Sequence, residues 1–197
     1  MVQFPGPPPV PVFADPVKNK PVFGPRKSPS QPNVFPGMRV LIAGPAAPEF
    51  IIKAAQRTGP EGHVFVVRER QAAMDRLEER VQPFGFGNLT LQVSATYELD
   101  MPDASVDRVY WVSVLDKITD KLQALKEARR VLKAVGLLGV DQRLFDLGFS
   151  GRKAVLRWCK KAGFDLAASY GTPLHYLLVF RLVKDDQNNP MQPASTS

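Results

Sequence analysis

Short apolar runs alternate with amphipathic stretches along most of this chain. Seven runs have the length and the β-branched or aromatic content of strands: 38–43, 63–67, 89–93, 106–112, 137–140, 164–170 and 174–183. Between them, apolar residues at helical spacing predict helices over 48–57, 71–81, about 120–132 and 151–162. The last two runs flank Gly-Thr-Pro and predict a hairpin that closes the fold.

The same spacing predicts which side of each helix faces the core. We expect apolar stripes of Ala73, Leu77 and Val81 in the second helix, of Leu122, Leu125, Ala128 and Leu132 in the third, and of Ala154, Val155, Trp158, Cys159 and Ala162 in the fourth. Thr119 or Asp120 is the expected N-cap of the third helix.

Strands that alternate with helices require right-handed crossovers and therefore a mostly parallel sheet. The chain is thus predicted to be α/β, a doubly wound, mostly parallel Rossmann-like sheet with a terminal antiparallel hairpin. A fold of this kind binds its ligands at the carboxyl ends of the strands, where the strand order reverses. We expect that point between the first and the fourth strand.

The N-terminal segment differs from the rest of the chain in its high proline content. Residues 1–37 hold 11 of the 19 prolines, and proline removes a backbone donor and fixes φ. We therefore predict an extended or disordered arm over 1–37, a domain over 38–184 and a polar disordered tail over 185–197. Phe13, Phe23 and Phe35 are candidate partner-binding anchors. The arm is either a disordered tail or a segment that lies along a partner. In both cases the domain should fold without it.

Composition narrows the class of protein. A length of 197 residues suits one domain with extra tails, and a single cysteine with two histidines argues against a disulfide framework or a structural zinc site. No run is long enough to span a bilayer, and the N-terminus does not resemble a secretory signal, so a cytoplasmic protein is expected.

The net charge of +7 is compatible with an anionic partner, and nucleic acid is one possibility. Four basic residues on the third and fourth helices, Arg129, Arg130, Arg157 and Lys160, are candidates for a docking surface. The alternative is an ordinary solvated face.

Several segments, in order, resemble the class I S-adenosylmethionine-dependent methyltransferases. G-M-R-V-L-I-A-G is similar to the family's first strand and turn, and T-G-P-E-G-H-V-F-V-V to the connection into its second strand. The stretch around V-D-R-V-Y-W-V resembles its fourth strand, and L-K-E-A-R-R-V-L-K-A-V-G-L-L-G-V its helix–strand unit. The resemblance covers about residues 36–184 and implies the methyltransferase fold.

The resemblance also implies which positions contact the cofactor, and these positions are altered. Gly44 is retained in the first turn, but Ile42 replaces an acid and Ala46 replaces a later glycine, with prolines at 45 and 48. Arg68 stands where a carboxylate binds the ribose, and Glu69 follows one residue late. Ala95 stands where an aspartate contacts the adenine. Gly44, Ala46, Glu69 and Ala95 are thus vestigial cofactor positions.

Each lost hydrogen bond to a buried polar group costs about 1–3 kcal/mol, so the losses together argue against ordinary S-adenosylmethionine binding. The sequence therefore favours a catalytically degenerate pseudoenzyme, with no cofactor and no catalytic residue, that serves as a binding or structural subunit for a protein partner. The alternative is an active methyltransferase with an atypical cofactor pocket. Cys159, His63 and His175 are predicted to be structural.

Overall fold

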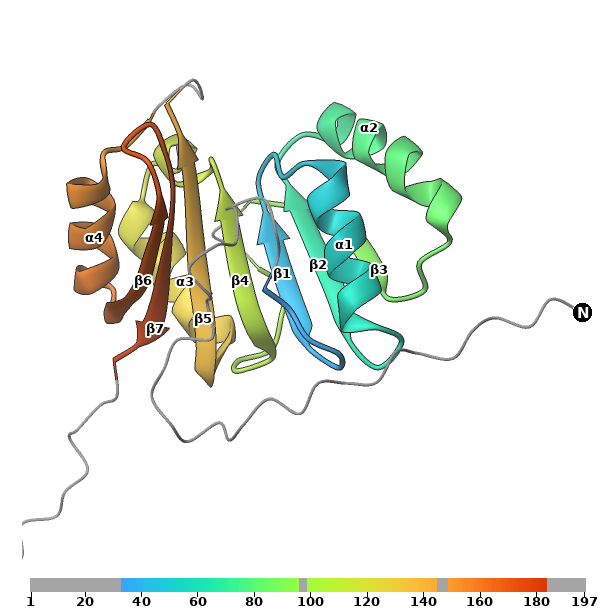
Figure 1. The fold of residues 1–197 in the computed structure, drawn as a ribbon, viewed down its shortest axis with the longest axis horizontal. Coiled ribbons are helices and arrows are strands. Elements are labelled where there is room, and N and C mark those ends of the chain that lie inside the picture. The colour runs from blue at the N-terminus through green and yellow to red at the C-terminus, as the bar shows by residue number, and fades with distance from the viewer. Residues whose placement is uncertain (1–32, 96–98, 145–148, 184–197) are drawn as a thin grey trace, which may run out of the picture.

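The structure is a computed structural model that describes residues 33–95, 99–144 and 149–183. Within these residues, seven strands form one sheet in the order β3-β2-β1-β4-β5-β7-β6 (Figure 1). The strands are β1 (Arg39–Ala43), β2 (His63–Arg68), β3 (Leu89–Val93), β4 (Val106–Val112), β5 (Leu132–Arg143), β6 (Phe164–Gly171) and β7 (His175–Leu182). β1 to β5 pair in parallel, and β7 pairs antiparallel with both β5 and β6. The predicted fold class is confirmed.

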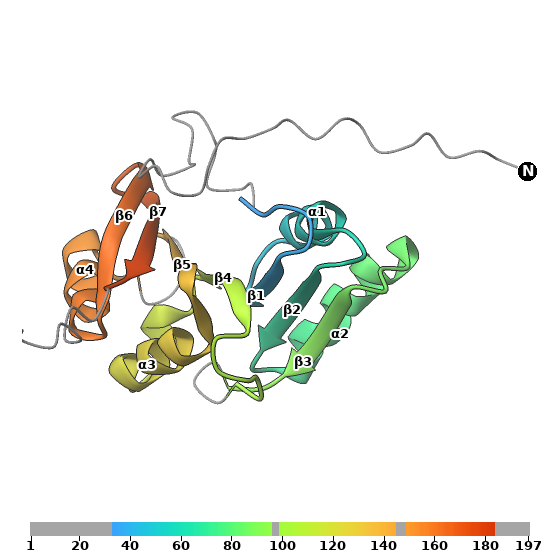
Figure 2. The same ribbon diagram turned by 90° about the horizontal axis from the view of Figure 1, so that it is seen from below.

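The helices divide between the two faces of the sheet. They are α1 (Pro48–Thr58), α2 (Gln71–Val81), α3 (Lys121–Val131) and α4 (Arg152–Lys161), with short 3-10 turns η1 (Gln82–Phe84) and η2 (Leu115–Lys117). The inner sides of α1 and α2 share one apolar cluster with β1 and β2, whereas α3 and α4 cover β4, β5 and β7 from the opposite face (Figure 2). None of these described helices is long and apolar enough to cross a membrane.

The helical stripes differ in detail from the sequence prediction. In α2, Met74 is buried with Leu77 and Val81 in place of Ala73. In α3, Leu122 is exposed, and the buried side consists of Ala124, Leu125, Ala128 and Val131. In α4, Trp158 is half-buried beneath Lys121, while Val155 and Cys159 are buried. The predicted cap is confirmed, because Asp120 accepts a hydrogen bond from the Gln123 N–H at 2.9 Å.

Strand β5 is much longer than the predicted run of residues 137–140. It begins at Leu132, directly where α3 ends, with no loop between them. Leu132 pairs with Val106 of β4, and a register irregularity follows before the pairing resumes at Leu137. Backbone pairing with β4 at Leu132 and again from Leu137 thus encloses residues 133–136, Lys-Ala-Val-Gly, within β5, although the apolar pattern does not mark them as strand.

The packed part of the chain begins before the expected boundary at residue 38. Val34 is buried in the cluster formed by α1, β1 and β2, and Phe35 is partly buried. The Asn33 N–H donates to the Tyr110 hydroxyl of β4 at 3.0 Å. A deletion of residues 1–37 would therefore remove part of the core. Phe13, Phe23 and the C-terminal tail lie outside the described residues.

The turn after β1 is fixed by its close approach to β4. Gly44 has φ of +94°, and its N–H donates to the Val67 carbonyl of β2 at 3.1 Å. A Cβ atom at Gly44 would lie 2.3 Å from the Val112 carbonyl oxygen. The glycine is thus required by the packing of the turn against the sheet, whether or not a ligand binds there.

We expect Gly44→Ala to destabilise the domain by about 3 kcal/mol or more, because the methyl group adds a backbone clash to the cost of a left-handed conformation. Gly85→Ala is the matched control. Gly85 also has positive φ, but a Cβ there meets nothing within 4 Å, so its cost should be about 1 kcal/mol. Urea denaturation measures both, and equal losses would show that the approach to Val112 is unimportant.

Arg130 of α3 is held against the segment before β4 by a network of contacts. Its guanidinium donates to Glu127 and Asp103 and to the carbonyls of Leu99 and Met101, at 2.5–3.1 Å. The hydrogen bond from Arg130 is the main cause that lowers the pKa of Glu127. The network fastens the segment before β4 to α3, so the Arg130 side chain has a structural role.

Arg130→Ala should therefore reduce the free energy of unfolding by about 1–3 kcal/mol at neutral pH. Lys126→Ala, an exposed change on the same helix, should cost under about 0.5 kcal/mol. Because the Glu127 pKa is lowered in the folded state, its contribution is fully present above its ordinary pKa and is lost as the pH falls through the folded value. The effect of Arg130→Ala should therefore shrink at an acidic pH below the folded-state pKa of Glu127. An effect of the same size at both pH values would contradict this assignment.

Candidate functional site

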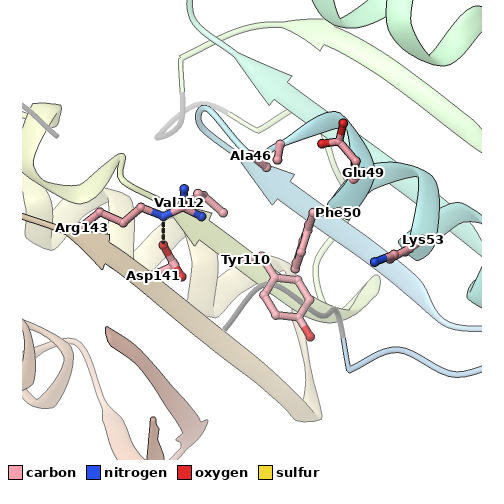
Figure 3. Close-up of a pocket in the computed structure, with 9 residues that line it drawn as sticks. Ala46, Glu49, Phe50, Lys53, Tyr110, Val112, Asp141 and Arg143 are labelled. Carbon is pink, nitrogen blue, oxygen red and sulfur yellow. Dashed lines mark ion pairs between the residues drawn. The ribbon is translucent and has the colours of Figure 1, made fainter. Parts of the chain in front are cut away.

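The strand order reverses between β1 and β4, and a cavity lies on the α1 side of the sheet close to this point. It has a volume of about 220 Å³. Its walls come from the β1–α1 loop and the first turns of α1, from β4 and from β5 (Figure 3). The lining residues are Ala46, Ala47, Glu49, Phe50, Lys53, Tyr110, Val112, Asp141 and Arg143.

The walls combine aromatic and charged groups. Phe50 and Tyr110 meet edge to face with ring centroids 5.3 Å apart. Burial raises the pKa of Tyr110 to about 12, so its hydroxyl stays protonated and cannot serve as a base near neutral pH. Glu49 and Lys53 lie one turn apart on α1. The cavity therefore offers an apolar wall with charges of both signs around it.

Asp141 joins this cavity to a histidine of the terminal hairpin. Its side chain is 8% exposed, and its Oδ2 lies 3.1 Å from the Nε2 atom of His175. Arg143 Nε lies 3.4 Å from the other carboxylate oxygen, an ion-pair separation that is long for a hydrogen bond. Burial raises the pKa of Asp141, while His175 and Arg143 oppose that rise. A buried carboxylate of this kind fixes the orientation of the imidazole.

The pair of Asp141 and His175 was not predicted from the sequence, which gives His175 a structural role. The two residues are 34 positions apart and meet because β5 and β7 are antiparallel neighbours in which Arg143 is opposite His175. The sequence does show a carboxylate, Asp141, at the end of an apolar strand, and this position could have marked it as a candidate site residue. The sequence alone could not place a histidine beside it.

The vestigial cofactor positions lie together at the carboxyl edge of β1, β2 and β3, but they offer little to a nucleoside. The Ala46 N–H donates within the loop, to the Gly44 carbonyl at 2.9 Å, and prolines 45 and 48 have no N–H. Ala95 follows β3 and supplies no side-chain acceptor, while Glu69 is an exposed residue just after β2.

Arg68 replaces the ribose-binding carboxylate with a group of opposite charge. Its Nη1 donates to the Ala73 carbonyl at 2.7 Å and its Nη2 to the Ala46 carbonyl at 2.9 Å. The guanidinium thus bridges the β1–α1 loop and the start of α2, and it has donors but no acceptor. The carboxyl edge of β2 thus offers donors to a ribose instead of the family's usual carboxylate acceptor. The cavity beside Gly44 has charges of both signs, which suit the amino-acid end of the cofactor.

Four further residues with chemically reactive or aromatic side chains have structural surroundings. Trp111 is buried, and Asp116 accepts a hydrogen bond from the Ser150 hydroxyl before α4. Cys159 is buried, and burial raises its thiol pKa to about 12, which makes it unreactive. His63 contacts the Thr90 hydroxyl at 2.8 Å.

The basic residues of α3 and α4 lie on neighbouring helices (Figure 2). Arg157 and Lys160 line a surface hollow with Leu156 and Lys161, whereas Arg129 donates to the Gly163 carbonyl at 3.1 Å. Because Arg129 and Arg130 make contacts within the chain, only Arg157 and Lys160 are left as candidates for the docking surface. That surface stays a prediction.

Comparison with known proteins gives one family. The model of the methyltransferase domain family matches residues 45–140. The demethylmenaquinone methyltransferase of Geobacillus kaustophilus is 31% identical over 105 residues, which are 53% of this chain and 45% of that protein. The ubiquinone/menaquinone biosynthesis C-methyltransferase UbiE of Bordetella avium is 35% identical over 106 residues, 54% of this chain and 41% of that protein. The match thus spans less than half the length of either relative.

Solved structures share the fold at low sequence identity. A methyltransferase from Aquifex aeolicus, titled as dependent on S-adenosylmethionine, has a TM-score of 0.68 and 18% identity, with 76% of this chain and 84% of that chain covered. The [4+2]-cyclase SpnF has a TM-score of 0.65 and 14% identity, with 76% of each chain covered. The fold by itself therefore does not decide the reaction. The family model, the relatives and the fold together support a methyltransferase domain of the class I S-adenosylmethionine-dependent kind over residues 45–140.

Proposed function

We propose that this chain is a methyltransferase that uses S-adenosylmethionine in an atypical pocket, with the methyl acceptor bound in the cavity between α1 and β5. The observation that carries the proposal is the charged cavity close to the reversal of strand order, which is where doubly wound sheets bind ligands. The names of the relatives support the same activity and do not support the expectation that no cofactor binds. When bound, S-adenosylmethionine supplies an electrophilic methyl group.

The cavity residues are suited to a zwitterionic group. Glu49 and Asp141 can accept hydrogen bonds from an ammonium, and Lys53 and Arg143 can donate to a carboxylate. The edge-to-face pair of Phe50 and Tyr110 forms an apolar wall for a flat ring. This side of the pocket can therefore hold the amino-acid end of a cofactor close to an aromatic acceptor.

We infer that the acceptor is an aromatic ring with an ionisable hydroxyl, such as the reduced form of a quinone of the kind in the relatives' names. His175 is half-exposed and is oriented by Asp141, which lines the cavity. An imidazole in this position can accept the hydroxyl proton as the ring carbon or oxygen becomes nucleophilic. The role of the chain is to orient the ring and remove that proton.

Arg68 weakens cofactor binding in this proposal without excluding it. Its two hydrogen bonds go to neutral carbonyls, and each such bond contributes a net stabilisation of about 0.5–1.5 kcal/mol. A long, half-buried side chain can leave these carbonyls when a ribose enters, so the cost of displacement is a few kcal/mol at most.

Arg68→Asp should therefore strengthen binding of S-adenosylhomocysteine by at least about tenfold, because it restores a ribose acceptor and removes the guanidinium. The control is Arg70→Asp, which makes the same charge change two residues away at an exposed position. Isothermal titration calorimetry measures both. An affinity that rises equally in the two variants would show a general charge effect, and the assignment of Arg68 to the ribose position would fail.

The second candidate function is a non-catalytic binding subunit. Arg68 and Ala95 favour it, because both expected polar contacts to the nucleoside are replaced. An absence of heat with millimolar S-adenosylhomocysteine for both the natural chain and Arg68→Asp would overturn the enzymatic proposal in favour of this one.

The proposed base has its own test. His175→Asn should lower the rate of methyl transfer from labelled S-adenosylmethionine to a reduced naphthoquinone by about 10²- to 10⁴-fold. His63→Asn is the control, because His63 lies on β2 beside Thr90, away from the cavity residues. Should His175→Asn transfer methyl groups as fast as the natural chain, His175 is not the base.

A further inference from the structure

The outer side of α4 carries only positive charges. This helix has no acidic residue, and its buried side consists of Val155 and Cys159. Four exposed cations at the helical spacings i, i+4, i+7 and i+8 form the basic face of α4 on the opposite side: Lys153, Arg157, Lys160 and Lys161. Among the residues that the structure describes, none of these four cations makes an ion pair or a side-chain hydrogen bond.

This arrangement is unfavourable for the helix by itself. Lys153 and Lys161 each lie four residues from Arg157, and like charges at that spacing repel each other. Lys153 also lies in the first turn, where the positive end of the helix dipole disfavours a cation. The other amphipathic helix of similar length, α2, carries charges of both signs. The basic face of α4 therefore indicates an anionic partner that offsets the repulsion.

The neighbouring helix α3 continues the positive surface (Figure 2). Arg129 of α3 donates to the Gly163 carbonyl just after α4, and Lys126 is exposed on the same side of α3. Glu127, the acid of α3, points away from α4, because it accepts a hydrogen bond from the Leu99 N–H before β4 at 3.2 Å. The positive surface thus extends over both helices without an acidic side chain of either helix between them.

Exposed leucines lie on both sides of the basic face. Leu166 of β6 is 44% exposed and pairs with Phe180, whose side chain is buried under α3 and α4. Because directly paired residues share a face of the sheet, Leu166 lies beside α4. Leu122 of α3 is 38% exposed and lies in line with Lys126 and Arg129 on the side toward α4. The surface is therefore positive in the middle and apolar at its borders.

An extended anionic surface fits this pattern better than a peptide does. Peptides bind in grooves or along strand edges. The hollow beside the basic face has only one wall, because all its lining residues come from α4: Leu156, Arg157, Lys160 and Lys161.

Nucleic acid fits the pattern less well for a different reason. Contacts to its backbone commonly include hydroxyl and amide side chains, and its bases stack on exposed aromatic rings. α4 has no hydroxyl or amide side chain, and the Lys121 ammonium lies over its aromatic ring, Trp158, at 5.3 Å from the centroid. A bilayer with anionic headgroups, by contrast, attracts cations and accepts exposed apolar side chains at its interface.

We propose that the basic face of α4 binds the surface of a bilayer that contains anionic phospholipids, with Leu122 and Leu166 at the level of the headgroups. Lysine and arginine have long aliphatic stems, so their charged ends can reach headgroup phosphates while the leucines enter the interface. The cavity between α1 and β5 lies on the other face of the sheet and shares no residue with this surface. The inference therefore does not depend on the proposed function.

Co-sedimentation of the full-length chain with lipid vesicles tests this surface. Vesicles of phosphatidylcholine with about one quarter phosphatidylglycerol should bind the chain at least about tenfold more strongly than vesicles of phosphatidylcholine alone. Raising the salt concentration from about 0.05 M to about 0.5 M should weaken binding to the anionic vesicles, because salt screens surface charges. Equal binding to both kinds of vesicle, or binding to neither, would overturn the proposal.

The double change Arg157→Glu with Lys160→Glu should reduce binding to the anionic vesicles by at least about tenfold, since each cation near the surface contributes about fivefold. Arg70→Glu with Arg76→Glu is the control, because it makes the same change of net charge at exposed positions at and near the start of α2. It should retain most of the binding. All four positions are exposed, so both variants should keep the circular-dichroism spectrum of the natural chain. Equal losses in the two variants would attribute the binding to net charge alone and contradict the assignment to α4.

Two further measurements separate the parts of the surface and its possible partners. Leu122→Ser with Leu166→Ser should weaken binding to the anionic vesicles severalfold and leave its salt dependence, because only the apolar contact is lost. Unchanged binding would remove the leucines from the interface. A short duplex DNA should fail to displace the chain from the vesicles. Displacement by the DNA that is lost in Arg157→Glu with Lys160→Glu would assign the basic face to nucleic acid instead of lipid.

Discussion

The approach of the β1–α1 turn to β4 is the contact on which the rest of the site depends. Gly44 can pass within reach of the Val112 carbonyl because it has no side chain. Its N–H is bound to β2, so the turn is tied to both neighbours of β1. This arrangement places the first turn of α1 above the end of β4 and leaves the cavity between Phe50 and β5. A family glycine is thus retained here for a reason of packing.

The two ends of the site differ from the pattern that the family resemblance implies in two separate ways. At the β2 end, Arg68 is a donor where an acceptor is expected. Its hydrogen bonds go to the carbonyls of the β1–α1 loop and of α2, so these groups are already paired within the chain. At the β5 end, Asp141, Arg143 and His175 form a polar cluster that the family resemblance did not indicate. The two changes have opposite consequences for a ligand, because the first competes with a nucleoside and the second provides contacts for a polar group.

Where sequence reasoning went wrong, local patterns competed with tertiary contacts. The extent of β5 was underestimated because residues 133–136, Lys-Ala-Val-Gly, do not continue the apolar run, yet the backbone of β4 pairs on both sides of them. The predicted buried face of α3 was wrong because Leu122 fits the helical spacing of the apolar residues but faces solvent in the structure. Arg130 looked like a free surface cation, and its partners Asp103 and the carbonyls of Leu99 and Met101 lie in a loop with no regular pattern.

The sequence by itself determined the alternation of strands and helices and the parallel sheet with its terminal hairpin, and it placed Ile42, Arg68 and Ala95 where the family resemblance implies acids. These features follow from local periodicity and from residue identity. Only the tertiary structure decided that Arg68 bridges two carbonyls and that Asp141 meets His175. Both depend on strand register and on side-chain direction across neighbouring strands, which are set by long-range packing and leave no trace in a local pattern.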